Sequence, residues 1–162
     1  MDHPLKSTPG CPKTGWQWLR AVDLHEDEGR KFGDYAQCEY CWQEQIRFVH
    51  YLKHTDWKHT IKVGRICANE LSGDKRADSS EQSLRNHAQR RSNFPALKGW
   101  KSSAKGNLWI EYQDHHIVIM RSASGKFRLR IDGVFGKLDF PDLRSAKLRA
   151  FDVVMRKIDR EG

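Results

Sequence analysis

The sequence from residue 37 to residue 74 reads QCEYCWQEQIRFVHYLKHTDWKHTIKVGRICANELSGD and holds three of the four cysteines in the chain. Cys38 and Cys41 have the Cys-x2-Cys spacing, which lets two thiolates bind one tetrahedral zinc ion about 2.3 Å from each sulfur. Cys67 comes after a hairpin pattern, at the start of a short helical segment. The stretch therefore predicts a module closed by one structural zinc ion.

The residues between the cysteine pair and Cys67 predict a β-hairpin. From Ile46 to Lys53, apolar and polar residues alternate with the period of a strand. Residues 55–58 are typical of a turn, and residues 60–63 predict the return strand. Gly64 then lets the backbone bend into the short helix, which ends before Gly73.

The register of this hairpin points to a fourth zinc ligand. If the hairpin turns at its expected centre, His50 lies opposite Val63, on the same face as Cys67 and nearest to it. The histidines at the hairpin tip would lie roughly 13 Å further along the strands. We take His50 as the fourth ligand, His54 as the second choice and His25 as an outside alternative.

A Cys-x2-Cys knuckle, a hairpin and a helix opened by a cysteine occur in this order in treble-clef and zinc-ribbon-like fingers. The segment also resembles zinc-binding modules of phage and mobile-element proteins, through IRFVH at 46–50, His54, and VGRICA at 63–68. A treble clef usually takes two ligands from its helix, whereas here the helix offers only Cys67. The resemblance implies metal binding and no particular activity.

The composition predicts a soluble, cytoplasmic protein, and the resemblance to phage and mobile-element modules implies a bacterial or phage-infected cell. The chain has 162 residues, of which 38% are hydrophobic and 31% charged. No apolar run approaches the roughly 18 residues of a membrane helix, and the N-terminus has no apolar signal segment. In a reducing compartment a Cys-x2-Cys pair favours metal binding over a disulfide. Cys11, between Gly10 and Pro12, is expected to be a free thiol in a loop.

The positive charge is concentrated in the second half of the chain. Residues 1–74 carry 10 Lys and Arg against 11 Asp and Glu, whereas residues 75–162 carry 19 against 10. The two halves have net charges of −1 and +9, which together give the total of +8. The basic half is the expected binding region for a polyanion such as nucleic acid. The alternative is that the positive charge only keeps the protein soluble.

We predict an α+β protein with four segments. Residues 1–15 form a flexible lead-in, and residues 16–74 form the zinc-binding finger, with a strand or helical turn at 16–22. Residues 75–95 form a basic helical linker, and residues 96–162 form a basic sheet-helix domain. The acidic run at 26–28 is expected to be a solvated loop.

The C-terminal segment predicts a small antiparallel sheet followed by a helix. Residues 109–112, 117–121 and 127–131 indicate three short strands, and Asp132-Gly133 indicates a turn. A short link at 134–136 leads to a final helix that Asp142 caps. The buried face of this helix is expected to consist of Leu143, Ala146, Ala150, Val154 and Ile158.

Three strands and one packed helix resemble the AP2-type DNA-binding domain that accompanies phage and mobile-element endonucleases. The residues that carry this resemblance are 127–131, Gly136, Phe140 and 146–152. It implies that the sheet face opposite the helix lies in the DNA major groove and uses Arg and Trp side chains.

Alternation along residues 126–131 assigns the two faces. Phe127, Leu129 and Ile131 point to the helix, so the cations between them point outward, where they suit phosphates and guanine edges. An ordinary solvated sheet face is the alternative. The expected nucleic-acid contacts are Lys101, Lys105, Arg121, Lys126, Arg128, Arg130, Trp100 and Trp109.

These patterns favour a non-catalytic, zinc-stabilised nucleic-acid-binding protein, with duplex DNA as the favoured partner and no membrane. The alternative is an inhibitor or adaptor that docks on a nucleic-acid-processing or bacterial defence complex, in the manner of an anti-CRISPR protein. Tyr51 and Trp57 would then be exposed aromatic anchors. A third hypothesis is an HNH-like nuclease using His115 or His116, but the last helix lacks the Asn and His that this motif requires.

Overall fold

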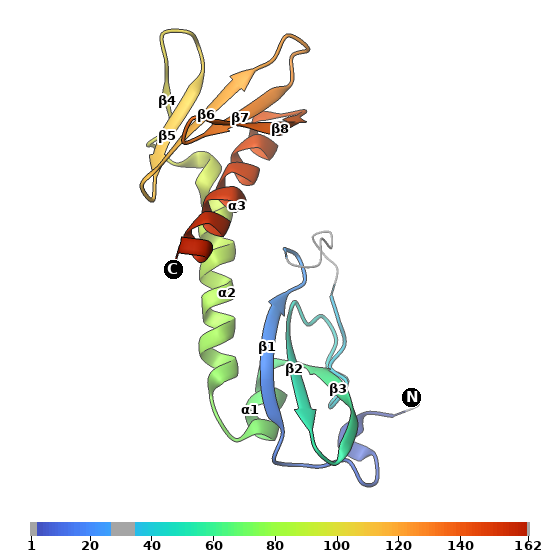
Figure 1. Cartoon of the computed structure of the whole chain (residues 1–162). Helices are drawn as coiled ribbons and strands as arrows, with labels where there is room; N and C mark the ends of the chain where they lie inside the picture. Colours follow the sequence, from blue (N-terminus) through green and yellow to red (C-terminus); the bar gives the residue numbers. More distant parts are fainter. Residues whose placement is uncertain (1–2, 27–34, 162) are drawn as a thin grey trace. The chain divides into compact units, whose positions relative to one another are not determined.

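The computed structural model describes residues 3–26 and 35–161, and it has an α+β fold. The chain divides into two compact units, Met1–Ala88 and Gln89–Gly162 (Figure 1). The division falls within the helix α2 (Arg76–Asn93), in the stretch that the sequence assigns to a linker. Positions 27 and 28 of the acidic run lie outside the described residues. No helix in the described parts of the chain is long and apolar enough to span a membrane.

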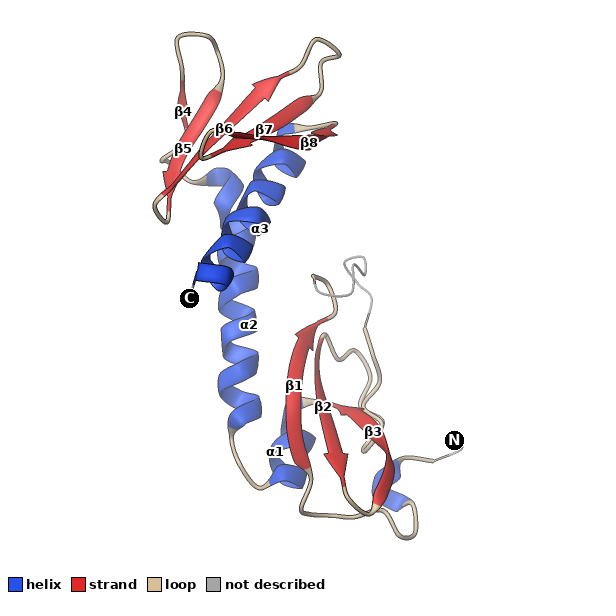
Figure 2. Cartoon of the chain, viewed as in Figure 1, coloured by secondary structure: helices blue, strands red, loops and turns tan. Residues whose placement is uncertain are grey.

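The N-terminal unit is built on a three-stranded antiparallel sheet of β1 (Gln17–Asp23), β2 (Phe48–His54) and β3 (Trp57–Val63), in that order (Figure 2). The predicted hairpin is confirmed as β2 and β3, and His50 pairs with Val63 as expected. Residues 17–22, for which the sequence left a strand or a helical turn open, belong to β1. Strand β1 pairs with β2 and completes the sheet.

The helix α1 (Arg65–Ser72) follows β3 directly and is the short helix that Gly64 and Cys67 predict. Gly73 ends it in the left-handed conformation, with φ of 71°, and its N–H donates to the carbonyl of Asn69. A glycine suits this position because it has no Cβ to oppose a positive φ. α1 therefore ends after eight residues, and Cys67 lies in its first turn.

The N-terminal lead-in packs on the finger, which differs from the flexible segment expected. Its short 3-10 helix η1 (Leu5–Ser7) buries Leu5 completely. The N–H groups of Leu5 and Lys6 donate to the carbonyls of Glu39 and Tyr40 at 3.0 and 2.9 Å. Cys11 is also buried and belongs to the same apolar cluster, so its free thiol does not lie in an open loop.

The C-terminal unit contains a five-stranded antiparallel sheet in sequential order, and the helix α3 (Leu143–Glu161) packs on it. The three strands that the sequence predicts are β5 (Leu108–Tyr112), β6 (His115–Arg121) and β7 (Phe127–Ile131). Two edge strands were missed, β4 (Lys101–Ser102) and β8 (Val134–Phe140).

Strand β8 replaces the short link expected at 134–136. Asp132 and Gly133 both have positive φ values, 51° and 81°. Two such residues form a tight turn whose twist matches that of the flanking strands, so the chain continues into a hairpin. As a result β8 runs for seven residues along β7 and becomes one edge of the sheet.

The core between the sheet and α3 follows the predicted alternation. Leu129 and Ile131 are buried, and the expected helix residues Ala146, Ala150 and Val154 face them, with Leu143 and Ile158 packed at the periphery. The sequence missed Phe151, which is fully buried and lies with its ring centroid 5.5 Å from that of Phe94 in η2 (Phe94–Ala96). Asp142 caps α3 as expected, because its Oδ1 accepts the N–H of Ser145 at 2.7 Å.

Replacing Phe151 with alanine should lower the free energy of unfolding of the C-terminal unit by about 3–5 kcal/mol, because a buried ring leaves a cavity that its neighbours fill only in part. Denaturant unfolding measures the difference. Phe135→Ala is the matched control: 58% of Phe135 is exposed, so the change should cost less than about 1 kcal/mol. Equal losses in both variants would contradict this assignment of the core.

Candidate functional site

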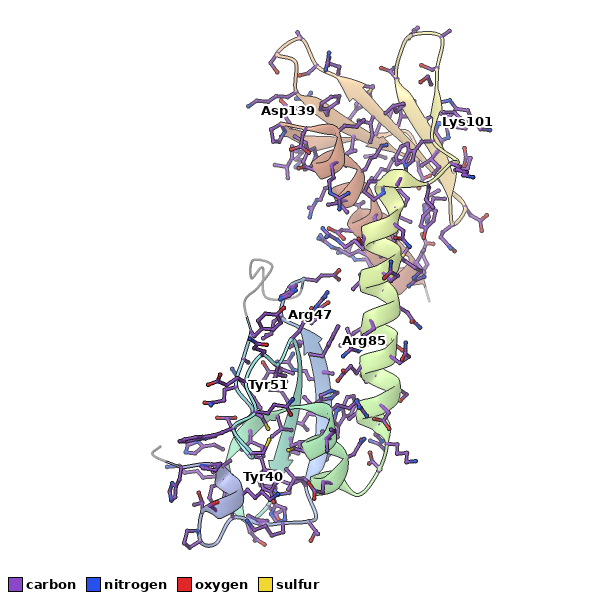
Figure 3. The ribbon with its side chains drawn as sticks, turned by 180° about the vertical axis from the view of Figure 1, so that it is seen from behind. Tyr40, Arg47, Tyr51, Arg85, Lys101 and Asp139 are labelled. Carbon is purple, nitrogen blue, oxygen red and sulfur yellow. The ribbon has the colours of Figure 1, made fainter. Side chains whose placement is uncertain are left out.

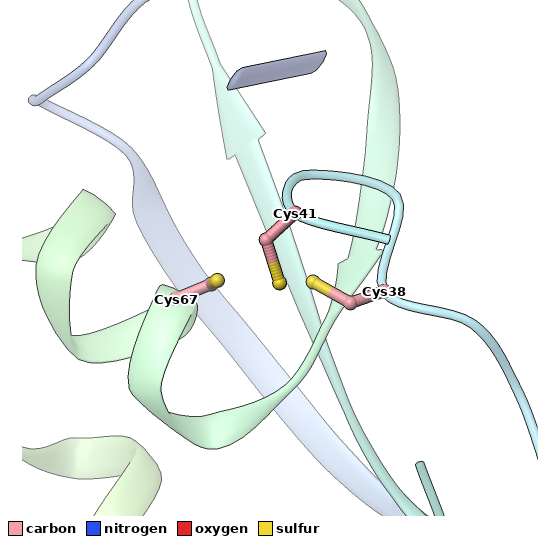
Figure 4. Close-up of side chains that lie close together, drawn as sticks. All are labelled: Cys38, Cys41 and Cys67. Carbon is pink, nitrogen blue, oxygen red and sulfur yellow. The ribbon is translucent and has the colours of Figure 1, made fainter. Parts of the chain in front are cut away.

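Three thiols from two separate segments meet in the N-terminal unit. The Sγ atoms of Cys38, Cys41 and Cys67 all lie within 4.8 Å of one another (Figure 4). Cys38 and Cys41 belong to the loop before β2, and Cys67 lies in the first turn of α1. Cys38 and Cys67 are buried and Cys41 is half-buried. The fold therefore brings together the three cysteines that the sequence singles out.

The loop that carries Cys38 and Cys41 is a tight knuckle held by its own backbone. The N–H of Cys38 donates to the carbonyl of Gln43, and the N–H of Trp42 donates to the carbonyl of Cys38, each at 2.8 Å. Trp42 takes a left-handed conformation with φ of 65°. Both thiols of the Cys-x2-Cys pair therefore point to the same side of the turn.

The Cys38 sulfur lies in an environment that favours the thiolate. A hydrogen bond from the Cys67 thiol lowers the pKa of Cys38 to about 5, although burial opposes this shift. The backbone N–H groups of Cys41, Gly64 and Tyr40 also point at this sulfur and lower its pKa further. The same hydrogen bond raises the pKa of Cys67, which keeps its proton in the metal-free protein.

This donor set fits a metal ion that prefers sulfur. Sulfurs bound tetrahedrally at about 2.3 Å lie about 3.8 Å apart. The three thiols, all within 4.8 Å of one another, can therefore supply three ligands to one ion. Thiolates select ions such as Zn²⁺ over Mg²⁺ or Ca²⁺, which prefer oxygen ligands. The backbone N–H groups around Cys38 would orient its sulfur and offset its charge.

His50 does not join the cysteines, which corrects the expected ligand set. It is completely buried, and its Nδ1 accepts the indole N–H of Trp18 at 3.1 Å. Its Nε2 lies 2.9 Å from Oε2 of Glu81, so the ring donates its proton to that carboxylate. The expected pairing with Val63 is right. The predicted ligand is wrong because of what the side chain contacts. One ring nitrogen bonds with Trp18 of β1, and the other bonds with Glu81 of α2.

The alternative histidines also lie apart from the thiols. Nδ1 of His54 accepts the N–H of Asp56, and its ring packs on Trp16 at 5.3 Å between centroids. His25 packs against Tyr35. Within the described residues the metal-ligand group consists of cysteines alone.

The buried Glu81 that binds His50 also binds a cation. Arg85 donates to its Oε1 at 2.7 Å. Burial would raise the pKa of Glu81, but the hydrogen bonds from His50 and Arg85 outweigh it and hold the pKa below the ordinary value. The carboxylate therefore stays ionised inside the protein, where it needs both partners.

In the C-terminal unit, the sheet face opposite α3 carries cations and aromatic rings in one cross-strand row. The strand register pairs Lys101 with Trp109, Trp109 with Val118, Val118 with Arg130, and Arg130 with Phe135. The Lys101 ammonium lies 5.0 Å from the Trp109 ring, and the Arg130 guanidinium lies 5.4 Å from the Phe135 ring. We call these five residues the sheet-face row.

Three further predicted contacts are exposed on or near this face. Arg128 lies on it, but its guanidinium is paired with Asp139 of β8 at 2.9 Å. Lys105 and Lys126 are exposed in the loops before β5 and β7. Figure 3 shows Lys101 and Asp139, which lie on the two edge strands of the sheet. The face therefore holds one cation that is paired with a carboxylate, Arg128, beside other exposed cations.

Two predicted contacts lie elsewhere. Trp100 packs against the core, and its indole N–H donates to the carbonyl of Phe94 at 3.1 Å. Arg121 pairs with Phe127 and lies over its ring, on the side of the sheet that faces α3. Neither side chain is presented with the sheet-face row.

The aromatic anchors expected at the hairpin are covered. Tyr51 is only 9% exposed and lies between Arg20 and Lys62, whose charged ends are 4.1 and 5.7 Å from its ring. Trp57 is half-buried against the apolar cluster of the N-terminal unit. Neither residue is the freely exposed anchor that the inhibitor or adaptor hypothesis expects.

The two histidines of the nuclease hypothesis each contact a carboxylate. His115 is nearly buried, and its Nδ1 lies 2.6 Å from Oδ2 of Asp132, whose pKa this hydrogen bond lowers. His116 bonds with Glu111 on the neighbouring strand. Both pairs join strands of the sheet.

No family model, curated protein or solved structure matches the chain. Function is therefore inferred from the residues themselves.

Val118 and Phe135 of the sheet-face row were not predicted from the sequence. The Asp-Gly turn followed by the run 134–140 was the available signal for a further strand, and it would have placed Phe135 beside Arg130.

Cys67→Ser should abolish binding of a sulfur-seeking metal ion, whereas His50→Gln should retain it. The second variant should instead lower the free energy of unfolding by about 1–3 kcal/mol, because a glutamine amide cannot hold the Trp18 and Glu81 hydrogen bonds in the positions that the buried ring gives them. Metal content by mass spectrometry and denaturant unfolding separate the two effects. Loss of the metal in His50→Gln, with the fold retained, would restore His50 as a ligand.

Proposed function

We propose that the protein is a zinc-stabilised, non-catalytic nucleic-acid-binding protein that contacts its partner through the outer face of the C-terminal sheet. The observation that carries this proposal is the sheet-face row, in which Lys101 and Arg130 alternate with Trp109 and Phe135. Duplex DNA is the favoured partner.

Each part of the row has a use in binding nucleic acid. Lysine and arginine neutralise phosphates and release counterions, which supplies most of the affinity. Arginine also forms paired hydrogen bonds with guanine in the major groove, and aromatic rings contact sugars or bases. The resemblance to the AP2-type domain supports the same face and the same groove.

The charge distribution supports this assignment. Residues 75–162 carry 19 Lys and Arg against 10 Asp and Glu, so the net charge of +8 comes from this half of the chain. A positive field of this kind attracts a polyanion and speeds encounter with it. The N-terminal residues 1–74 are close to neutral and are assigned no phosphate contacts.

Zinc has a structural role in the proposal. Cys38, Cys41 and Cys67 would hold one ion, which joins the knuckle to α1 and supplies folding free energy to the N-terminal unit. The resemblance to zinc-binding modules of phage and mobile-element proteins supports zinc over other thiophilic ions and suggests an origin of that kind. The proposal places the protein in the cytoplasm, where thiols stay reduced.

Lys101→Ala combined with Arg130→Ala should weaken duplex DNA binding by at least about tenfold and reduce the salt slope of log affinity by about two. Fluorescence anisotropy with duplex DNA, single-stranded DNA and RNA across a salt series measures both. Arg156→Ala with Arg160→Ala is the matched control, since it removes two exposed cations from α3 instead. Equal loss in both double variants, or no binding near 50 mM salt, would refute the proposal.

Removing zinc with a chelator should unfold the N-terminal unit and leave the C-terminal unit folded. The reason is that the metal would join only segments of the N-terminal unit, while α3 and its sheet have their own apolar core. Amide NMR signals of the whole chain, recorded before and after chelation, follow both units. An N-terminal unit that keeps dispersed signals without metal would contradict a folding role for zinc.

A further inference from the structure

One edge of the C-terminal sheet is both unpaired and apolar. Strand β8 is the last strand in the sheet order, so no strand of the described chain pairs with its outer side. It exposes Val134, Phe135 and Leu138 at 67%, 58% and 57% of their surface. Proteins usually protect such an edge, because its free N–H and carbonyl groups and apolar side chains invite another strand.

A groove with a volume of about 300 Å³ runs between this strand and α3. Its walls include Leu129 of β7, Leu138 of β8 and Val153 of α3. Strand β8 lines the groove with residues 134–138 and Phe140, and its register against β7 shifts between Arg128 and Arg130. An extended chain beside β8 has alternate side chains that can enter this groove.

The charge around the groove is of one sign. Lys137, Arg149 and Lys157 line it, and no carboxylate does among the described residues. Lys157 lies 3.5 Å from Asp132, whereas Lys137 and Arg149 have no ion pair in the described structure. Two unpaired cations beside an apolar groove are complementary to a partner that is acidic as well as apolar.

We propose that β8 and this groove bind an extended acidic peptide segment of a partner protein, which adds to the sheet as a sixth strand. Alternate apolar side chains of the peptide enter the groove against Leu138 and Val153. Its carboxylates pair with Lys137 and Arg149, and its backbone bonds with the open edge of β8. The strand length of seven residues sets the length of the segment.

Other occupants match the groove less well. A second copy of the chain paired edge to edge would bring Lys137 and Arg149 against the same cations. A nucleic acid would meet the charge but leave apolar walls against its phosphates. The site adjoins the proposed nucleic-acid face at Phe135, which lines the groove and also belongs to the sheet-face row, whereas Leu138 and Arg149 line the groove alone.

The test uses the full chain labelled with ¹⁵N and the synthetic peptide acetyl-EVELEVE-amide. Titration followed by amide NMR should shift signals of β8 and of α3 around Arg149, and raised salt should weaken binding. The peptide acetyl-KVKLKVK-amide has the same apolar residues and the opposite charge, so it should bind at least about tenfold more weakly.

Matched variants locate the contact. Leu138→Glu and Arg149→Glu should each weaken binding of the acidic peptide by about tenfold. Leu97→Glu and Arg156→Glu make the same changes outside the groove and should stay within about twofold. All four positions are at least partly exposed, so the fold should survive, and unshifted core amides confirm that it does.

Several results would overturn the proposal. These are an absence of shifts in β8, equal binding of the basic peptide, and equal loss in the control variants. Concentration-dependent dimerisation that shifts β8 without peptide would assign the edge to a second copy. Shifts of β8 with duplex DNA in place of the peptide would assign it to nucleic acid. Failure of DNA binding in the Lys101→Ala and Arg130→Ala test leaves this test unaffected, since neither of those residues lines the groove.

Discussion

The meeting of three thiols joins a knuckle to a helix in the N-terminal unit. Cys38 and Cys41 are held by the knuckle, and Cys67 is held by α1, on the far side of the hairpin in sequence. A hydrogen bond between the Cys38 and Cys67 sulfurs already joins the two segments, and backbone N–H groups stabilise the charge on Cys38. The arrangement prepares a site for a thiophilic ion, because the fold already collects the three thiols and lowers the pKa of Cys38.

A second polar contact attaches α2 to the same unit. This helix has a thin apolar side, and its buried residues are Ala77 and Glu81. Glu81 is ionised inside the protein and is held by His50 from β2 and by Arg85 from its own helix. Such a contact is specific, since a buried carboxylate without its partners is costly. A histidine that looks like a metal ligand in the sequence therefore orients a helix.

The C-terminal sheet has three different surfaces, and strand alternation assigns residues to each. One face buries Leu129 and Ile131 against α3, and the opposite face presents the sheet-face row. The edge strand β8 adds an apolar groove bordered by cations. These surfaces are chemically distinct: the outer face suits phosphates and flat bases, whereas the groove suits apolar side chains with carboxylates between them. Under the two proposals, one small domain presents neighbouring surfaces to a nucleic acid and to a protein segment.

Local sequence determined the elements whose signals lie within a few residues. The sequence predicted the strand at 46–53, the end of α1 at Gly73 and the start of α3 at Asp142. It also predicted the Cys-x2-Cys knuckle and the outward direction of Arg128 and Arg130. Each of these features follows from backbone geometry over one turn or one strand. Tertiary structure alone decided which distant groups meet. The two ring nitrogens of His50 bond with Trp18 and Glu81. The indole N–H of Trp100 donates to the carbonyl of Phe94, and Arg128 forms an ion pair with Asp139. These pairings join residues from 6 to 32 positions apart. The physical reason is that the alternation along a strand determines which face of the sheet a side chain lies on. It does not determine which residue from another part of the chain packs against that side chain.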